Sequence, residues 1–197
     1  MTPILDKAQG IIVAGVGGQG AITLAQLILG AAWKSDYFCL QSEVHGMSQR
    51  GGAVNAHIVF DSAPVTSPTI MEGAADVLIG MEPLETLRYI HMVKKDGNVI
   101  SSTSPLINMS TYPEESQVLS AIKEIDGIHL VDTNESTKTL KNRHAGNVIL
   151  LGMASKFLPM EQDLWHTIFE ERFKAKGEKV IQKNIEAFTH GRNLINT

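Results

Sequence analysis

Short apolar runs alternate with segments of helical periodicity along the first two thirds of the chain. Apolar residues spaced three and four apart predict helices at residues 21–33, 82–91 and 114–124. Apolar runs with many β-branched side chains predict strands at 10–14, 37–41, 53–60, 75–80, 98–101 and 128–132. Most of these runs lack polar alternation, which is typical of parallel strands buried on both faces. We therefore predict a doubly wound, mostly parallel α/β sheet.

The pattern changes after residue 141. Helical periodicity continues through 148–157, 161–174 and 176–190, and no further strand is predicted. We expect one domain of residues 1–197, with a sheet region at 1–141 and a helical layer at 142–197. That layer either covers the sheet or meets another subunit. A chain of 197 residues can bury a core that needs neither a disulfide nor a metal.

Charge and cysteine content exclude several functions. The net charge is −4, so the chain offers no overall basic field for nucleic acid or an anionic membrane. The single cysteine, Cys39, cannot form an internal disulfide, ligate an iron–sulfur cluster by itself or build a four-cysteine zinc site. No signal-peptide pattern and no membrane-length apolar run are present, so we expect a cytoplasmic protein.

A glycine-rich turn separates the first predicted strand from the first helix. Strand, Gly-x-Gly-x-x-Gly and helix together are typical of Rossmann-like folds, in which glycines let a phosphate approach the helix start. The candidates for binding a phosphate-bearing group are Gly15, Gly17, Gly18, Gln19 and Gly20. The acid expected to bind a ribose is missing, because Asp36 precedes the second strand and Glu43 follows it. The glycines alternatively make only a tight turn.

The segment at residues 43–52 is the most polar stretch between two predicted strands. It reads Glu-Val-His-Gly-Met-Ser-Gln-Arg-Gly-Gly, and ten such residues exceed what a turn requires. We predict a loop that carries a functional surface; a solvated surface loop is the alternative. The candidate residues are Glu43, His45, Gly46, Met47, Ser48, Gln49, Arg50, Gly51 and Gly52.

Other polar residues carry weaker signals. His57 lies within a predicted strand, where a hydrogen-bonded sheet residue is commoner than a catalyst. The serine-rich segment 101–105 and the segment 132–134 each follow a strand, at the edge where parallel sheets bind ligands. Such turns also occur without any ligand.

Four segments together resemble one family, the gamma-type domain of 2-oxoacid:ferredoxin oxidoreductases, and most closely its indolepyruvate-type members. They are residues 11–20, 42–52 and 75–85, and Asn147 before Val-Ile-Leu-Leu-Gly. The resemblance covers nearly the whole chain, and the segment at 42–52 is the most specific part of it.

The resemblance implies an enzyme subunit. Such enzymes oxidatively decarboxylate a 2-oxoacid, coenzyme A takes the acyl group, and ferredoxin takes the electrons. The resemblance places thiamine diphosphate, magnesium and the iron–sulfur clusters on a larger alpha subunit. It also implies that residues 43–52 pack against that subunit, near a site for the oxoacid or coenzyme A. Arg50 would bind a carboxylate or phosphate, His45 would supply a hydrogen bond, and Glu43 would orient either of them.

Three alternatives remain open. An internal Arg50–Glu43 ion pair would merely shape the loop. A stand-alone NAD-dependent dehydrogenase would need a ribose-binding acid and a proton-handling residue, for which His57 and His144 are the candidates. A non-catalytic partner or regulatory subunit would keep the fold without the activity. Met47 is an apolar residue in a polar loop, so we also expect an apolar surface there that lets the isolated chain dimerise.

Overall fold

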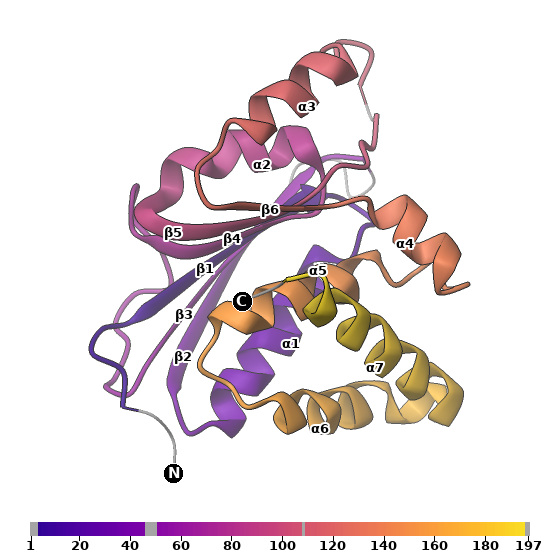
Figure 1. Ribbon diagram of the computed structural model, residues 1–197. Helices are drawn as coiled ribbons and strands as arrows, with labels where there is room; N and C mark the ends of the chain where they lie inside the picture. The colour runs from indigo at the N-terminus through magenta and orange to yellow at the C-terminus, as the bar shows by residue number, and fades with distance from the viewer. Residues whose placement is uncertain (1–3, 46–50, 108, 196–197) are drawn as a thin grey trace.

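A mixed sheet of six strands, with helices on both faces, forms the centre of the molecule in the computed structural model (Figure 1). The structure describes residues 4–45, 51–107 and 109–195, and of His45 only the backbone. The strands follow the order β2-β3-β1-β4-β5-β6 across the sheet. Their bounds are Gln9–Val16 for β1, Phe38–His45 for β2, Ala53–Asp61 for β3, Ala75–Gly80 for β4, Val93–Ser102 for β5 and Ile128–Val131 for β6.

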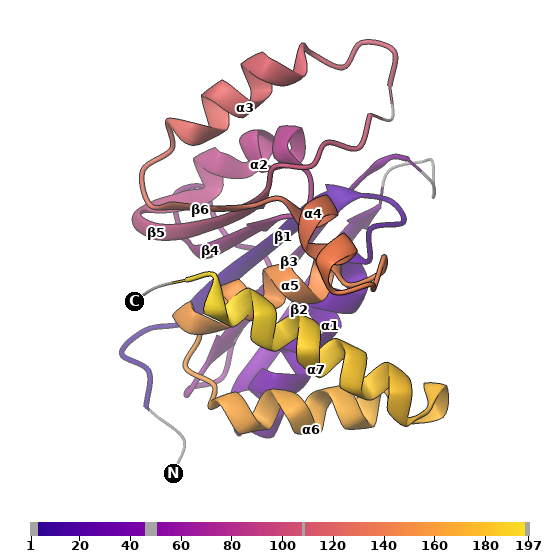
Figure 2. The same ribbon diagram turned by 45° about the vertical axis from the view of Figure 1, so that its right-hand side comes forward.

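Helices lie on both faces of the sheet. Helices α2 and α3 lie on one face (Figures 1 and 2). On the other face α1 and α5 pack against the strands, α6 packs against α1, and α7 packs against α5. The bounds are Ala21–Lys34 for α1, Pro83–Tyr89 for α2, Glu115–Lys123 for α3, Thr133–Thr139 for α4, Gly146–Ala154 for α5, Gln162–Phe173 for α6 and Glu178–Asn193 for α7. Single 3-10 turns occupy Ile90–Met92, Ser155–Phe157 and Lys174–Lys176.

The strand pairing confirms the predicted doubly wound, mostly parallel sheet. β1, β4, β5 and β6 pair in parallel in that order, whereas β3 runs antiparallel to both β1 and β2. Every residue of β4, and all but the first of β1, are buried, as expected for central strands covered on both faces. The antiparallel β2–β3 pair forms one edge of the sheet, because successive strands joined by a short connection pair as a hairpin.

The second strand is longer than predicted. It extends to His45, and its ladder with β3 runs without a bulge from Phe38 opposite Asp61 to His45 opposite Val54. The prediction that placed Glu43 and His45 in a loop was therefore wrong. Polar side chains suit this strand because it lies at the sheet edge, where only one side of the backbone is paired.

Two other boundaries differ from the prediction. Strand β5 begins at Val93, earlier than the strand predicted at 98–101, and its residue Lys94 forms an ion pair with Asp76 at 2.6 Å between Nζ and Oδ1. Helix α4 was not predicted; it begins where the Asp132 side chain accepts a hydrogen bond from the Glu135 backbone N–H at 2.9 Å.

The C-terminal helices share a core with the sheet. Trp165, Phe169 and Phe188 are fully buried and pack in the same cluster as Ile11 and Val13 of β1. Helices α5 and α7 meet closely at two glycines, Gly152 of α5 and Gly191 of α7. The helical layer thus covers the sheet face on which α1 also packs.

Candidate functional site

Strands β1 and β4 lie side by side, but their chains leave the sheet toward opposite faces. After β1 the chain enters α1, which packs in the cluster of Ile11 and Val13. After β4 it enters α2, on the face of Ile12 and Ala14. Ligand crevices in open α/β sheets form at the carboxyl ends of strands where the connections diverge in this way. The architecture therefore places a candidate site between the glycine turn and the start of α2.

The two glycine-rich segments singled out in the sequence meet at this crevice. The Gly17 N–H donates to the Gly52 carbonyl oxygen at 2.8 Å, and the Gly51 N–H donates to the Gly17 carbonyl oxygen at 3.5 Å. These bonds continue the β1–β3 ladder past its last pair, Val16 and Ala53. Residues 46–50, which include the candidates Gly46, Met47, Ser48, Gln49 and Arg50, lie outside the described residues.

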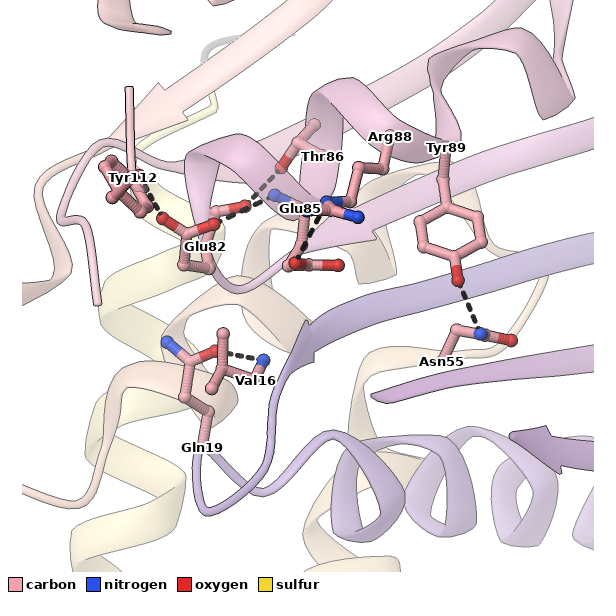
Figure 3. Close-up of polar contacts among 9 residues, drawn as sticks. All are labelled: Val16, Gln19, Asn55, Glu82, Glu85, Thr86, Arg88, Tyr89 and Tyr112. Atoms are coloured by element: carbon pink, nitrogen blue, oxygen red, sulfur yellow. Dashed lines mark hydrogen bonds and ion pairs between the residues drawn. The ribbon is translucent and has the colours of Figure 1, made fainter. Parts of the chain in front are cut away.

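The Gln19 side chain closes the glycine turn from within. Its Oε1 accepts from the Val16 N–H at 2.8 Å (Figure 3). Its Nε2 donates to the Met81 carbonyl oxygen at 3.0 Å. A Cβ on Gly15 would lie 3.0 Å from both Gln19 Oε1 and Met81 Cβ, so these two side chains would have to shift slightly to admit one. Gln19 thus links the ends of β1 and β4 and uses one N–H and one acceptor site of its amide inside the fold.

Asn147 lies against the glycine turn at the start of α1. A Cβ on Gly20, whose φ is 88°, would come within 2.7 Å of Asn147 Nδ2, and that amide is 3.5 Å from the Gly20 carbonyl oxygen. Both residues, together with Gly18 and Gln19, line a cleft of about 820 Å³ on the helical side of the turn. The structure therefore brings Asn147 to the glycine turn.

A buried polar cluster at the start of α2 was missed by the sequence reasoning. Glu82 caps the helix by accepting from the Glu85 N–H at 2.9 Å, and its other carboxylate oxygen accepts from the Tyr112 hydroxyl at 2.5 Å (Figure 3). Thr86 Oγ1 donates to the Glu82 carbonyl oxygen and lies 2.7 Å from Ser101 Oγ. The signal in the sequence was the acid directly before Pro83, since proline favours the first turn of a helix.

Glu85 is the least satisfied member of this cluster. It is 2% exposed; Oε1 lies 3.3 Å from Arg88 Nε, whereas Oε2 has no hydrogen-bond partner in the described part of the chain. Burial raises the pKa of Glu85 above its ordinary value, the Arg88 charge opposes this shift, and the Glu82 charge adds to it. Burial likewise raises the pKa of Tyr89, whose hydroxyl oxygen accepts from Asn55 Nδ2 at 2.6 Å.

We expect Glu85→Gln to stabilise the chain at neutral pH. The raised pKa means that the folded state holds the proton more tightly than the unfolded state, so ionisation lowers stability as pH rises above about 4.5. Glutamine keeps the shape and removes the buried charge. Urea unfolding at pH 4.5 and 7.5 measures the difference, which we expect to grow with pH.

The exposed Glu124, changed to Gln in the same way, reports what this substitution does at the surface. If Glu85→Gln is less stable than the native chain at pH 7.5, the ion pair with Arg88 outweighs the cost of burial and the interpretation is wrong.

Neither candidate for a ribose-binding acid lies next to the glycine turn. β2 is the edge strand, and β3 separates it from β1. Asp36 precedes β2, at the opposite end of the sheet from the turn, and Glu43 lies near the end of β2, two strands away from β1. The arrangement differs from the classic dinucleotide fold, in which the second strand neighbours the first.

The remaining polar candidates are engaged within the fold. His57 Nδ1 accepts from the Ile70 N–H at 3.2 Å, and burial lowers the pKa of this histidine, as expected for a hydrogen-bonded sheet residue. Ser104 Oγ donates to Asp132 Oδ1 at 2.9 Å, and Ser102 Oγ lies 2.7 Å from Thr133 Oγ1. The serine-rich end of β5 therefore holds the start of α4.

Within residues 4–45, 51–107 and 109–195, no three His, Cys, Asp or Glu side chains gather as a metal site would require. None of the helices in those ranges is long and apolar enough to cross a membrane.

Comparison with known proteins gives consistent matches. Residues 10–194 match the family model described as pyruvate ferredoxin/flavodoxin oxidoreductase. The chain is 33% identical to indolepyruvate oxidoreductase subunit IorB of Archaeoglobus fulgidus, over 93% of each chain. It is 37% identical to the Pyrococcus horikoshii protein of the same name, over 74% of this chain and 76% of that one.

Solved structures share the fold. The gamma subunit of a keto/oxoacid ferredoxin oxidoreductase from Geobacter sulfurreducens matches with a TM-score of 0.70 at 19% identity, over 94% of this chain and 97% of that one. A 2-oxoglutarate:ferredoxin oxidoreductase from Magnetococcus marinus, solved with 2-oxoglutarate, coenzyme A and succinyl-CoA bound, matches with a TM-score of 0.76 at 19% identity. That match covers 96% of this chain and 31% of the longer one.

Proposed function

Because the chain belongs to the pyruvate ferredoxin/flavodoxin oxidoreductase family, we propose that it is the smaller subunit of an enzyme that oxidises aryl 2-oxoacids such as indolepyruvate. In this reaction the oxoacid loses carbon dioxide, coenzyme A takes the acyl group, and two electrons pass to ferredoxin. The 33% identity to a protein named as an indolepyruvate oxidoreductase subunit, over 93% of the chain, supports this substrate class.

We assign the redox chemistry to a larger partner subunit. The only thiol, Cys39, is partly buried, and its Sγ lies 3.9 Å from the Leu29 carbonyl oxygen. One cysteine cannot ligate an iron–sulfur cluster by itself. The residues of this chain therefore do not fit such a cluster. Thiamine diphosphate, magnesium and the clusters would belong to the partner, which supplies the carbanion and electron-transfer chemistry.

The observation that carries a role for this chain is the junction of its two glycine-rich segments at the crevice. The bonds between Gly17 and residues 51–52 fix the end of the β2–β3 connection beside the glycine turn. From that anchor, Arg50 would reach a carboxylate or phosphate at the subunit boundary, because its planar fork suits both groups. His45 would supply a hydrogen bond to a polar group of the substrate, and Glu43 would orient Arg50 or His45. Coenzyme A, which carries phosphates, is the candidate ligand for the turn.

An apolar strip on β2 offers a surface for the partner. Phe38, Leu40 and Val44 are 51%, 37% and 57% exposed. Val44 lies opposite Asn55, which bonds to Tyr89 of α2, so the strip lies on the α2 side of the sheet. The strip ends next to the 46–50 connection, so a single partner surface can cover both. Without the partner, two copies of the chain would associate through this strip.

Substituting Arg50 by alanine tests the ligand role. In the reconstituted complex we expect the KM for the oxoacid or for coenzyme A to rise about tenfold or more, because a hydrogen bond to a charged group is worth roughly 1.5–3 kcal/mol. Steady-state kinetics with each substrate varied in turn gives the two KM values.

Arg172→Ala is the matched control, since Arg172 is an exposed arginine of α6 that bonds only to Gln26 among the described residues. Unchanged KM values and unchanged assembly for Arg50→Ala would remove the ligand role. They would favour an arginine that pairs with Glu43 and shapes the connection.

The rival proposals make different demands. A stand-alone NAD-dependent dehydrogenase requires tight NAD binding by the isolated chain, which calorimetry measures; the displaced position of β2 argues against it. A non-catalytic partner subunit would bind the larger chain, yet its removal would leave oxoacid oxidation unchanged.

A further inference from the structure

The cleft on the helical side of the glycine turn has the size of a ligand site. Its volume of about 820 Å³ lies within the range of small-molecule pockets. Three parts of the chain that are distant in sequence build it: the glycine turn, the segment from α4 to the start of α5, and α7 with the 3-10 turn before it. No described side chain fills this space.

Positive charge is concentrated around this cleft, although the whole chain carries a net charge of −4. Arg143, Lys176 and Lys183 line it together with His144, and no Asp or Glu is among the lining residues. None of the three cations forms an ion pair within the described residues. An adjoining hollow shares Arg143 and Lys183 and adds Lys138 and Lys141. The overall charge had suggested no basic field; folding creates a local one.

Uncharged polar groups along the cleft supply further hydrogen-bond donors. Asn147 and Asn184 contribute amides, and Thr23 contributes a hydroxyl. Helices α1 and α5 both begin there, after Gly20 and Ala145, and neither helix has a side-chain cap. Their first N–H groups add further donors suited to an anion. The apolar residues that line the cleft are Val148, Leu150, Phe173 and Val180, and of these only Val180 is more than 7% exposed.

We propose that this cleft binds a nucleotide with two or more phosphates, with Arg143 and Lys183 contacting the phosphates and the remaining volume of the cleft accommodating the nucleoside. Several unpaired cations around one cleft suit a polyphosphate better than a single carboxylate, because their mutual repulsion is relieved most by an anion of several charges. The ligand is either a free nucleotide or the nucleotide half of coenzyme A. The inference concerns this chain alone and does not require catalysis.

Calorimetry on the full chain with ADP, inorganic pyrophosphate and adenosine tests the proposal. We expect ADP and pyrophosphate to bind, adenosine to bind at least tenfold more weakly, and ADP affinity to fall as salt increases. Absence of ADP binding at millimolar concentration, or equal binding of adenosine and ADP, would overturn the proposal.

Two variants localise the site. Arg143→Gln combined with Lys183→Gln removes two cations. Asn184→Asp adds a negative charge at nearly the same volume and removes the amide that donates to the Val180 carbonyl oxygen at 2.7 Å. We expect each to weaken ADP binding at least tenfold. The control, Lys123→Gln combined with Lys156→Gln, removes the same charge from exposed positions outside the cleft and should stay within twofold. If the double variant misfolds, Asn184→Asp still tests the proposal, because a thermal unfolding curve like that of the native chain shows that this variant is folded.

Competition identifies the source of the nucleotide. If coenzyme A displaces ADP, the cleft takes the nucleotide half of coenzyme A; if ADP binds and coenzyme A does not compete, the ligand is a free nucleotide. Variants that bind ADP as tightly as the native chain would overturn the placement. Failure here would count against coenzyme A as a ligand of the glycine turn, but it would leave the proposed oxoacid oxidation untouched, because no oxoacid or partner subunit is present in the test.

Discussion

Replacing Gly191 by alanine is expected to lower the free energy of unfolding by about 3 kcal/mol or more, at the upper end of overpacking costs. A Cβ at this position of α7 would lie 2.0 Å from the Ile149 carbonyl oxygen of α5. The reciprocal contact is as close, since a Cβ on Gly152 would lie 2.1 Å from the Phe188 carbonyl oxygen. Both obstacles are backbone atoms, so the helices themselves would have to separate. Urea unfolding followed by circular dichroism measures the loss.

Gly30→Ala is the matched control. Gly30 lies within α1, and its added Cβ would meet only Ile168 Cδ1, at an ordinary 3.6 Å. Alanine favours a helix interior over glycine by up to about 1 kcal/mol, so this variant should be as stable as the native chain or slightly more so. If Gly191→Ala lost no more than 1 kcal/mol, the close packing of α5 against α7 would be refuted.

Changing Val44 to aspartate is expected to weaken association with the larger subunit at least about a hundredfold, since an unpaired buried charge costs roughly 3–5 kcal/mol. Val44 is 57% exposed in the isolated chain, so its own folding should be nearly unaffected. Oxoacid oxidation by the mixed subunits should fall accordingly at concentrations near the native dissociation constant. Sedimentation or light scattering on mixtures of the two subunits measures the association directly.

Met71→Asp is the corresponding control. Met71 is 77% exposed and lies in the segment that precedes β4, at the end of the sheet opposite to the crevice. This variant should assemble normally. If Val44→Asp also assembled normally, the partner would not cover β2, and the isolated chain's apolar strip would need another explanation.

Periodicity predicted most of the fold because the central strands are buried on both faces. β1 and β4 are continuous apolar runs and are almost completely buried, so their sequences predicted the parallel core of the sheet. The full length of β2 was not predicted, because an edge strand tolerates polar residues such as Gln41 and Glu43 that are also typical of loops. The order of strands could not be predicted either, since pairing β3 between β1 and β2 depends on contacts distant in sequence.

The candidate site was predicted only in part. The glycine turn and the 43–52 segment were identified from residue type, and the structure joins them through Gly17. Glu82 and Tyr112 are 30 residues apart in the sequence, and no local sequence pattern predicts their contact. The basic cleft was not predicted for a similar reason. Its cations come from separate segments, and only folding brings Arg143 and Lys183 to one surface.

The most direct test of the central claim is reconstitution of activity from two chains. This chain would be expressed with and without its thiamine-dependent partner, and indolepyruvate-driven reduction of a viologen dye would be assayed with coenzyme A present. We predict activity only when both chains are combined. A stable complex without activity would indicate that the enzyme acts on a 2-oxoacid other than indolepyruvate. Absence of any complex would contradict the assignment of this chain as an oxidoreductase subunit.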